Sequence, residues 1–196
     1  MKLIRYLKNN LKKELIIGLM ILLFILWSFI LYNFPPDTII KFIGIDNSYI
    51  IVLVLGLLGG TSILFPFPYY LFVITFAVGG SNPILLGICT GIGVIIGEST
   101  SYFIGYHGRI IFSNSYQRKF NQLCTKCNQT KNTIILSIVL FIYGALVPFP
   151  NDFLILPLGA ARYNYWKLII PLGLGNICFS ILLAFAGIYG WNYFIK

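Results

Sequence analysis

Long apolar segments alternate with short polar breaks along most of the chain. Residues 15–32, 82–107 and 165–189 approach or exceed the roughly 17 to 25 residues with which a helix crosses a bilayer. No small-residue cleavage site follows the first segment, which therefore predicts a retained anchor helix rather than a signal peptide. The other two segments predict membrane-spanning helices.

Two further apolar segments are interrupted by prolines. In residues 48–80, Gly59 and Gly60 are followed by Pro66 and Pro68, which leaves arms of about 12 residues, or roughly 18 Å at 1.5 Å per residue. Neither arm crosses a hydrocarbon core of roughly 30 Å, and two prolines spaced by one residue end a helix. The segment predicts a hairpin that enters the membrane and returns to the same side.

The same arrangement recurs later in the chain. Residues 133–146 are apolar, Pro148 and Pro150 break the pattern, and residues 153–161 resume it. At an ungapped offset of 82 residues, roughly one position in four is identical. The matches include Pro66 with Pro148, Pro68 with Pro150, Asn82 with Asn164, and Gly93 and Gly105 with Gly175 and Gly187. Because each repeat holds one hairpin and one crossing, the second begins on the opposite face, and the repeats are inverted.

These elements predict an all-α integral membrane protein, in which an anchor helix precedes inverted repeats of a re-entrant helical hairpin plus a transmembrane helix. Interrupted helices at matching positions of inverted repeats are typical of transporters. The loop between the repeats has apolar residues at spacings of three and four, which predicts an amphipathic helix along the inner membrane surface. The expected divisions are 1–47, with the basic N-terminus, the anchor and an interfacial connector at 33–47, and a membrane domain at 48–191 made of 48–108, 109–132 and 133–191.

Composition excludes a soluble globular protein. The chain is 58% hydrophobic and only 10% charged, whereas soluble domains carry about 25% charged residues. Much of the net charge of +9 comes from basic clusters within residues 2–13 and 109–131, which flank apolar helices. The positive-inside bias predicts that both clusters and the N-terminus are cytoplasmic. The expected membrane is a prokaryotic plasma membrane, although the residues themselves do not distinguish it from a eukaryotic internal one. Nucleic-acid binding is the weaker explanation of the charge.

Glu98 is the acidic residue most deeply placed in a predicted spanning helix. It lies about ten residues from the helix end, or roughly 15 Å, which is near the bilayer centre. A carboxylate at that depth is costly and commonly functional. The alternative is a protonated Glu98 that bonds Ser99, Thr100 or another helix and only locks the packing.

Asn151 and Asp152 follow the second proline motif, where a helix is expected to begin. Either side chain could cap the free backbone donors of that helix. The functional alternative is that the same helix end, pointing at the midplane, offers donors and a positive dipole to a phosphate group. Arg109 and Arg162 could attract an anionic lipid headgroup at the cytoplasmic face, although positive-inside anchoring also explains them.

Motifs for other chemistry are weak. Cys124 and Cys127 form a lone C-x-x-C, and no second pair or neighbouring histidine supports a metal site. The sequence contains no apparent Ser-His-Asp set, phosphate-binding loop or H-E-x-x-H motif. We therefore expect no enzyme activity, no metal and no cofactor, and the spacing of glycines does not establish an oligomer.

Three segments resemble one known family. They are the hairpin motif of Pro66 and Pro68, the stretch from Gly159 to Arg162, and a glycine-rich run made of Gly93, Gly97, Glu98, Tyr102 and Gly105. Residues 48–191 are similar in these features to the DedA family, also called VTT or SNARE-associated membrane proteins. The resemblance implies lipid movement between leaflets, often dependent on a proton gradient. Thr61 and Tyr70 stand where many members carry acids, and Ala145 and Asn151 where they carry arginines.

The predicted function is a flippase or scramblase that moves an anionic lipid, either polyprenyl phosphate or phospholipid, between leaflets. Its partners would be membrane lipids, with protons as a candidate coupling ion. The alternative is a non-transporting membrane-organisation protein of the same fold. A small redox enzyme that uses Cys124 and Cys127 is a third hypothesis.

Overall fold

The computed structural model describes residues 18, 22, 25–27, 29–31, 33–61, 67–111, 117–118, 121–122, 125, 127, 130–147 and 150–195. No strand occurs within these residues, so the predicted all-α class is confirmed. The predicted anchor helix and the amphipathic loop at 109–132 lie largely outside the described residues, as do Pro66, Pro148 and Cys124. The helices are α2 (Pro36–Ile43), α3 (Ile45–Gly60), α4 (Tyr70–Val78), α5 (Pro83–Gly108), α7 (Thr130–Leu146), α8 (Asp152–Ala160) and α9 (Tyr165–Ile195), with a 3₁₀ turn at Arg109–Ile111.

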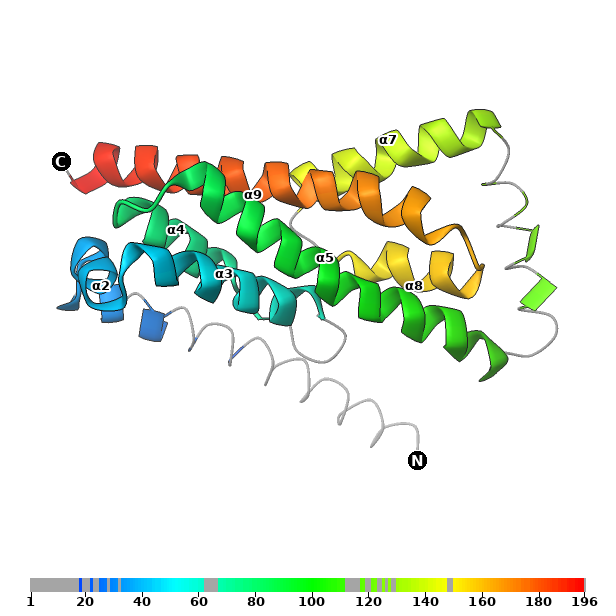
Figure 1. The fold of residues 1–196 in the computed structure, drawn as a ribbon, viewed down its shortest axis with the longest axis horizontal. Helices are drawn as coiled ribbons and strands as arrows, with labels where there is room; N and C mark the ends of the chain where they lie inside the picture. The colour runs from blue at the N-terminus through cyan, green and yellow to red at the C-terminus, as the bar shows by residue number, and fades with distance from the viewer. Residues whose placement is uncertain are drawn as a thin grey trace.

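Two of these helices, α5 and α9, extend along the whole molecule (Figure 1). Both are long and apolar enough to cross a membrane, as predicted, and at 1.5 Å per residue they measure about 39 and 46 Å. Glycines of α5 lie directly against α9: a Cβ at Gly87 would meet Ile181, and one at Gly91 would meet Ile177. Residue numbers increase along α5 from one contact to the next, while those of the contacted residues in α9 decrease. The two helices therefore run antiparallel.

The shorter helices form two pairs, α3 with α4 and α7 with α8. As predicted, a proline-containing break separates the members of each pair, at 61–69 and 147–151. The arms of the first pair differ in length, with 16 residues in α3 and 9 in α4. α3 begins earlier than expected, at Ile45, and α4 begins only after a turn at Tyr69. Figure 1 shows α3 and α4 in one half of the molecule and α7 and α8 in the other, with the end of α3 and the start of α8 toward the middle.

The connector at 33–47 contains the short helix α2, as expected, but α3 already begins within it. Gly44, with φ of 89°, separates α2 from α3, and glycine adopts such a φ without steric cost. The two helices meet at 97°, and counted as one bent segment they would add a third candidate span. Fold and composition together define an integral membrane protein.

The turns that follow α4 and α8 have the same hydrogen bonds. After α4, Gly79, Gly80 and Ser81 donate backbone N–H bonds to Thr75, Ala77 and Phe76. After α8, Ala161, Arg162 and Tyr163 donate to Pro157, Gly159 and Leu158, and each of these six residues is 82 positions after its counterpart. The second residue of each turn, Gly80 in the first and Arg162 in the second, has a positive φ. The sequence repeat is therefore matched by repeated local structure.

Contacts between helices also recur at the same offset. Gly105 of α5 packs on Leu156 of α8, and Gly187 of α9 packs on Ile74 of α4. A second pair of contacts joins Gly91 to Ile177 and Gly173 to Ile95. In each case the second contact is obtained from the first by exchanging residues that are 82 positions apart.

The molecular surface is apolar where a lipid-facing surface is expected. Large hydrophobic side chains are exposed on α3, α5, α7 and α9, for example Ile50, Ile96, Ile138 and Leu174. Several polar side chains lie inside instead, and they include Glu98, Ser101, Asp152, Asn176 and Ser180. Buried polar side chains and extensive exposed apolar surface are the informative departures from a soluble protein, so the polar residues of the interior are the first candidates for a site.

Candidate functional site

Glu98 lies on the inward face of α5 and is only 2% exposed. It is 15 residues after Pro83 and ten before Gly108, so the carboxylate sits about 22 Å and 15 Å from the two helix ends. Glu98 therefore lies in the middle part of α5. A carboxylate buried there needs hydrogen-bond donors, because an unpaired charge in an apolar interior is very costly.

Two asparagine amides supply those donors. Asn176 of α9 donates from Nδ2 to both Glu98 oxygens, at 2.9 Å to Oε1 and 3.0 Å to Oε2. Asn151, just before α8, donates from Nδ2 to Glu98 Oε1 and also to Asn176 Oδ1, the latter at 3.0 Å. We call Glu98, Asn151 and Asn176 the central polar cluster. It joins α5, α9 and the break between α7 and α8.

The expected local partners of Glu98 are engaged elsewhere. Ser99 Oγ donates to the Ile95 carbonyl and shares a hydrogen bond with the Tyr165 hydroxyl, and Thr100 Oγ1 donates to the Gly97 carbonyl. The expectation that Glu98 bonds Ser99 or Thr100 is therefore wrong, whereas the expected bond to another helix is present, from Asn176 of α9. Short hydroxyl side chains within a helix commonly bond the preceding turn of backbone.

The expected helix cap before α8 is also wrong. Asn151 occupies the N-cap position but makes no side-chain capping bond, because its amide is turned toward Glu98 and Asn176. The Asp152 carboxylate is 7% exposed, and its Oδ1 atom has no hydrogen-bond partner. Asp152 nevertheless lies within electrostatic reach of Glu98. Three of the predicted site residues, Glu98, Asn151 and Asp152, are thus brought together.

The first hairpin reaches the same region through Tyr69. This residue interacts electrostatically with Glu98, and its ring lies where a side chain on Gly59 would otherwise extend. Tyr69 is 82 positions before Asn151, so residues that follow the second proline of each break both approach Glu98. Pro68 and Pro150 are described, but the other prolines of the two motifs are not.

The glycine-rich run on α5 has packing contacts on both sides of Glu98. A Cβ on Gly93 would lie 2.0 Å from the Leu53 carbonyl oxygen, and one on Gly105 would lie 2.5 Å from that of Leu156. A Cβ on Gly97 would lie 2.3 Å from the Leu57 carbonyl oxygen. Tyr102 donates its hydroxyl to the Tyr163 carbonyl at 2.6 Å. These residues allow α3 and α8 to approach α5 closely.

Arg109 and Arg162 lie apart from the central polar cluster. Arg109 donates to the Ala160 carbonyl and to Asn121 at the end of α5, about 16 Å along the helix from Glu98. Arg162 is exposed, and its guanidinium stacks on the Tyr106 ring at 5.0 Å. With the exposed Lys167, these residues define what we call the basic end of the molecule. They share this end but do not contact the predicted residues at the centre.

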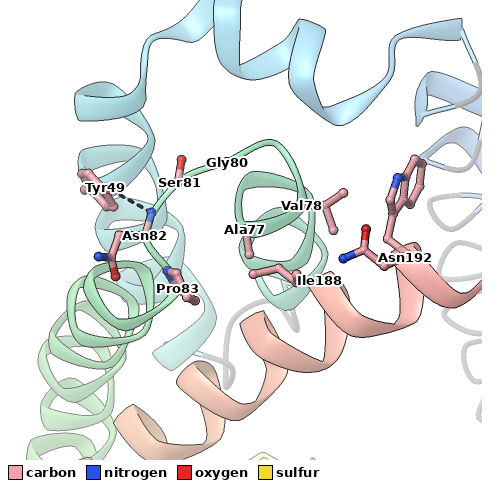
Figure 2. A pocket seen from close by; sticks show the side chains of 10 residues that line it. Tyr49, Ala77, Val78, Gly80, Ser81, Asn82, Pro83, Ile188 and Asn192 are labelled. Carbon is pink, nitrogen blue, oxygen red and sulfur yellow. Dashed lines mark hydrogen bonds between the residues drawn. The ribbon is translucent and has the colours of Figure 1, made fainter. Parts of the chain in front are cut away.

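The opposite end has an open cleft of about 570 Å³ without charged residues in its lining (Figure 2). Tyr49 and Asn82 border one side and Asn192 the other, with Ala77 and Ile188 between them (Figure 2). The Tyr49 hydroxyl accepts the backbone N–H of Asn82 at 3.0 Å. At the repeat offset, Gly80 and Trp191 of this cleft correspond to Arg162 and Arg109. The two ends therefore differ in charge at equivalent positions.

The other candidates give no further site in the described part of the chain. His107 Nδ1 contacts the Phe103 carbonyl at 2.9 Å, within its own helix. Cys127 is half-buried, and its predicted partner Cys124 is outside the described residues. No metal-binding group of three or more His, Cys, Asp or Glu residues occurs among the described residues.

Asn176 is the site residue that sequence reasoning did not single out. A neutral amide within an apolar helix is often a packing residue, and its partner Glu98 lies 78 residues earlier. One signal was present in the repeat. At the offset of 82 residues Asn176 corresponds to Val94, which lies one helical turn before Glu98, so Asn176 occupies nearly the same level of its helix as Glu98 does.

Comparison with protein-family models, with curated proteins and with solved structures finds no match to this chain.

Proposed function

We propose that this protein is a transporter of the DedA type that moves an anionic lipid between the leaflets of a membrane. The observation that carries the proposal is the central polar cluster. In this cluster the Glu98 carboxylate, in the middle part of α5, is hydrogen-bonded by an amide from α9, the other long apolar helix. Asn151, which precedes the second arm of the second hairpin, bonds the same carboxylate. Ionisable residues at this depth usually mark ion or substrate pathways.

An inverted repeat is part of the proposal. Its support is the antiparallel packing of α5 and α9, whose residues correspond at an offset of 82. The paired contacts Gly105–Leu156 and Gly187–Ile74 add to this support, because each joins a spanning helix to the second arm of the other repeat's hairpin. Two copies of one unit related by such an exchange have opposite orientations in the membrane.

Re-entrant hairpins are the second part. The second arms, α4 and α8, have 9 residues each, or about 13 Å, which is too short to cross roughly 30 Å of hydrocarbon. Non-helical backbone at mid-membrane depth is tolerated where protein buries it or where it lines a cavity. The breaks at 61–69 and 147–151 would therefore bound a passage for the polar headgroup, while the acyl chains stay in the bilayer.

The roles of the charged residues follow from their positions. At the basic end, Arg109, Arg162 and Lys167 would attract an anionic headgroup from the cytoplasmic leaflet. At the centre, Glu98 would bind and release a proton as the headgroup passes. The Asn151 and Asn176 amides would hold its carboxylate in place between those events.

The test is lipid movement in proteoliposomes. Fluorescent phospholipid and polyprenyl phosphate are followed with and without a proton gradient, comparing wild type, Glu98→Gln and the control Asp46→Asn, an exposed acid on α3. We expect gradient-stimulated movement that Glu98→Gln abolishes and Asp46→Asn preserves. Gradient-independent movement that survives Glu98→Gln would indicate a scramblase without coupling at Glu98, and no movement of either lipid would contradict the proposal.

One observation favours the alternative of a non-transporting membrane-organisation protein. Both Glu98 oxygens already have donors from two other elements, an arrangement that also suits a purely structural lock. That alternative expects Glu98→Gln and Asp152→Asn to leave the cellular phenotype intact, provided that the protein accumulates to wild-type levels.

A further inference from the structure

Two buried oxygens beside the central polar cluster have no hydrogen-bond partner. They are Oδ1 of Asp152, whose side chain is 7% exposed, and Oγ of Ser101, which is fully buried at 0%. More than about 90% of buried polar groups in folded proteins have a partner, and leaving one unpaired is costly. Two such atoms in one region therefore indicate a missing ligand.

The two residues belong to α5 and α8, which pack against each other. Ser101 is one helical turn after Glu98, so the two side chains share a face of α5. The neighbouring residues Tyr102 and Gly105 contact Gly159 and Leu156, which shows that this face packs on α8. Asp152 is the first residue of α8 and follows Asn151, which bonds Glu98 directly.

This region holds two acidic side chains and no basic partner within the described part of the chain. Glu98 and Asp152 interact electrostatically, and neither has a basic partner among the described residues. Arg109 and Arg162 are bound at the basic end. A buried carboxylate is costly without a neutralising partner, and a bound cation or a proton would supply one.

The donor set suits a small cation of single charge. Carboxylate and hydroxyl oxygens are hard ligands. Both Glu98 oxygens accept from amide donors, whereas the buried Asp152 Oδ1 accepts from none. Calcium generally needs six to eight oxygens, several of them carboxylate, and magnesium keeps much of its water. One free carboxylate oxygen and a hydroxyl match a monovalent ion better.

A further source of oxygen ligands lies nearby. A Cβ on Gly144 would be 3.3 Å from Asn176 Oδ1, so the last turn of α7 is beside the cluster. The final carbonyls of a helix lack intrahelical partners and carry its negative dipole end. Helix ends of this kind coordinate sodium in transporters with interrupted helices.

We propose that Asp152 and Ser101 bind a sodium ion at the junction of α5 and α8, beside the central polar cluster. This site is distinct from the proton site proposed at Glu98, and it holds whether or not the chain moves lipid. Its occupant would supply the missing partner of both orphan oxygens and neutralise one of the two carboxylates.

The test is ion binding to the purified full-length chain in detergent at fixed pH. Binding of ²²Na⁺ and the thermal melting temperature are measured as sodium chloride replaces choline chloride at constant ionic strength, with potassium chloride as a second salt. We expect saturable binding and a saturable rise in melting temperature with sodium. Asp152→Asn and Ser101→Ala should each raise the sodium concentration at half-saturation by at least about tenfold.

Ser99→Ala is the matched control, because the Ser99 hydroxyl already has partners in Ile95 and Tyr165. It should bind sodium as wild type does. Absence of ²²Na⁺ binding to folded wild type, or a Ser101→Ala variant that binds like Ser99→Ala, would overturn the proposal even if Asp152→Asn does not fold. A melting temperature that responds to pH but equally to all three salts would assign the site to a proton instead. Neither result depends on lipid transport.

Discussion

Asn176 holds both oxygens of the Glu98 carboxylate through a single amide group, with Nδ2 at 2.9 Å from Oε1 and 3.0 Å from Oε2. The two residues come from the antiparallel helices α9 and α5, and each is less than 5% exposed. A hydrogen bond to a charged group contributes about 1.5–3 kcal/mol. This contact therefore joins the two halves of the molecule at their centre.

Replacement of Asn176 by leucine should destabilise the fold. The apolar side chain fits the surrounding helix but removes two donors from a buried carboxylate, which should lower the free energy of unfolding by about 2–4 kcal/mol. Unfolding in mixed detergent micelles, followed by circular dichroism, measures the change. Asn192→Leu, an exposed position on the same helix, is the control and should change it by less than about 0.5 kcal/mol.

A double-mutant cycle separates this contact from general packing effects. In Glu98→Leu the buried charge is absent, so adding Asn176→Leu should cost much less than it does in wild type. Equal costs of Asn176→Leu in both backgrounds would mean that the Glu98 contact contributes nothing to stability.

The glycine-rich run should tolerate no added methyl group where α3 meets α5. A Cβ on Gly93 would lie 2.0 Å from the backbone oxygen of Leu53, which cannot move without shifting α3. Gly93→Ala should therefore lower the free energy of unfolding by about 1–3 kcal/mol. Gly108→Ala is the control on the same helix, since nothing lies within 4 Å of its Cβ position. Similar melting temperatures for the two variants would rule out a packing role for Gly93.

The spanning helices and the breaks could be predicted from sequence because their signals are local. The length of an apolar run and the positions of proline and glycine determine where α5 and α9 form and where the hairpin arms end. Glu98 could be recognised in the same way, because one ionisable residue in an apolar run is conspicuous. The arm lengths were less accurate, since the start of α3 depends on the single turn at Gly44.

The partners within the site could not be predicted, because they depend on contacts between distant segments. Asn151 has the residue type and position of a helix cap, and a local rule assigns its side chain to the following backbone. In the folded protein the Glu98 carboxylate competes for that amide and forms the stronger, charge-assisted bond. Asn176 was missed for the same reason, since its importance arises only when α9 lies against α5.

Cysteine labelling tests whether the hairpins are embedded in the membrane. Tyr70 is the first residue of α4 and Phe153 the second of α8, and the Phe153 side chain is 73% exposed on the protein surface. In a chain without its native cysteines, Tyr70→Cys and Phe153→Cys should react slowly with a water-soluble maleimide, because lipid covers them. Asp37→Cys and Lys167→Cys, both exposed, should react rapidly and from opposite sides of the membrane.

Rapid labelling of Tyr70→Cys and Phe153→Cys from an aqueous side would place the breaks in soluble loops. That result would contradict the re-entrant arrangement while leaving the all-helical fold intact. Labelling of Asp37→Cys and Lys167→Cys from the same side would contradict the antiparallel crossing of α5 and α9.

Arg162 offers a way to separate stability from headgroup attraction. Its φ of 57° is the only positive value among non-glycine residues in the described segments, and this conformation costs an L-residue about 1–2 kcal/mol. Arg162→Gly relieves that cost but loses the stacking on Tyr106, worth about 0.5–1 kcal/mol, and increases the freedom of the unfolded chain. These terms nearly cancel, so the free energy of unfolding should change by less than about 1 kcal/mol.

If Arg162 attracts anionic lipid, Arg162→Gly should reduce transport of polyprenyl phosphate at low ionic strength, and added salt should narrow the difference from wild type. Arg162→Lys, which keeps the charge, should transport nearly as well as wild type. Equal transport by the glycine and lysine variants at low salt would assign Arg162 to anchoring alone.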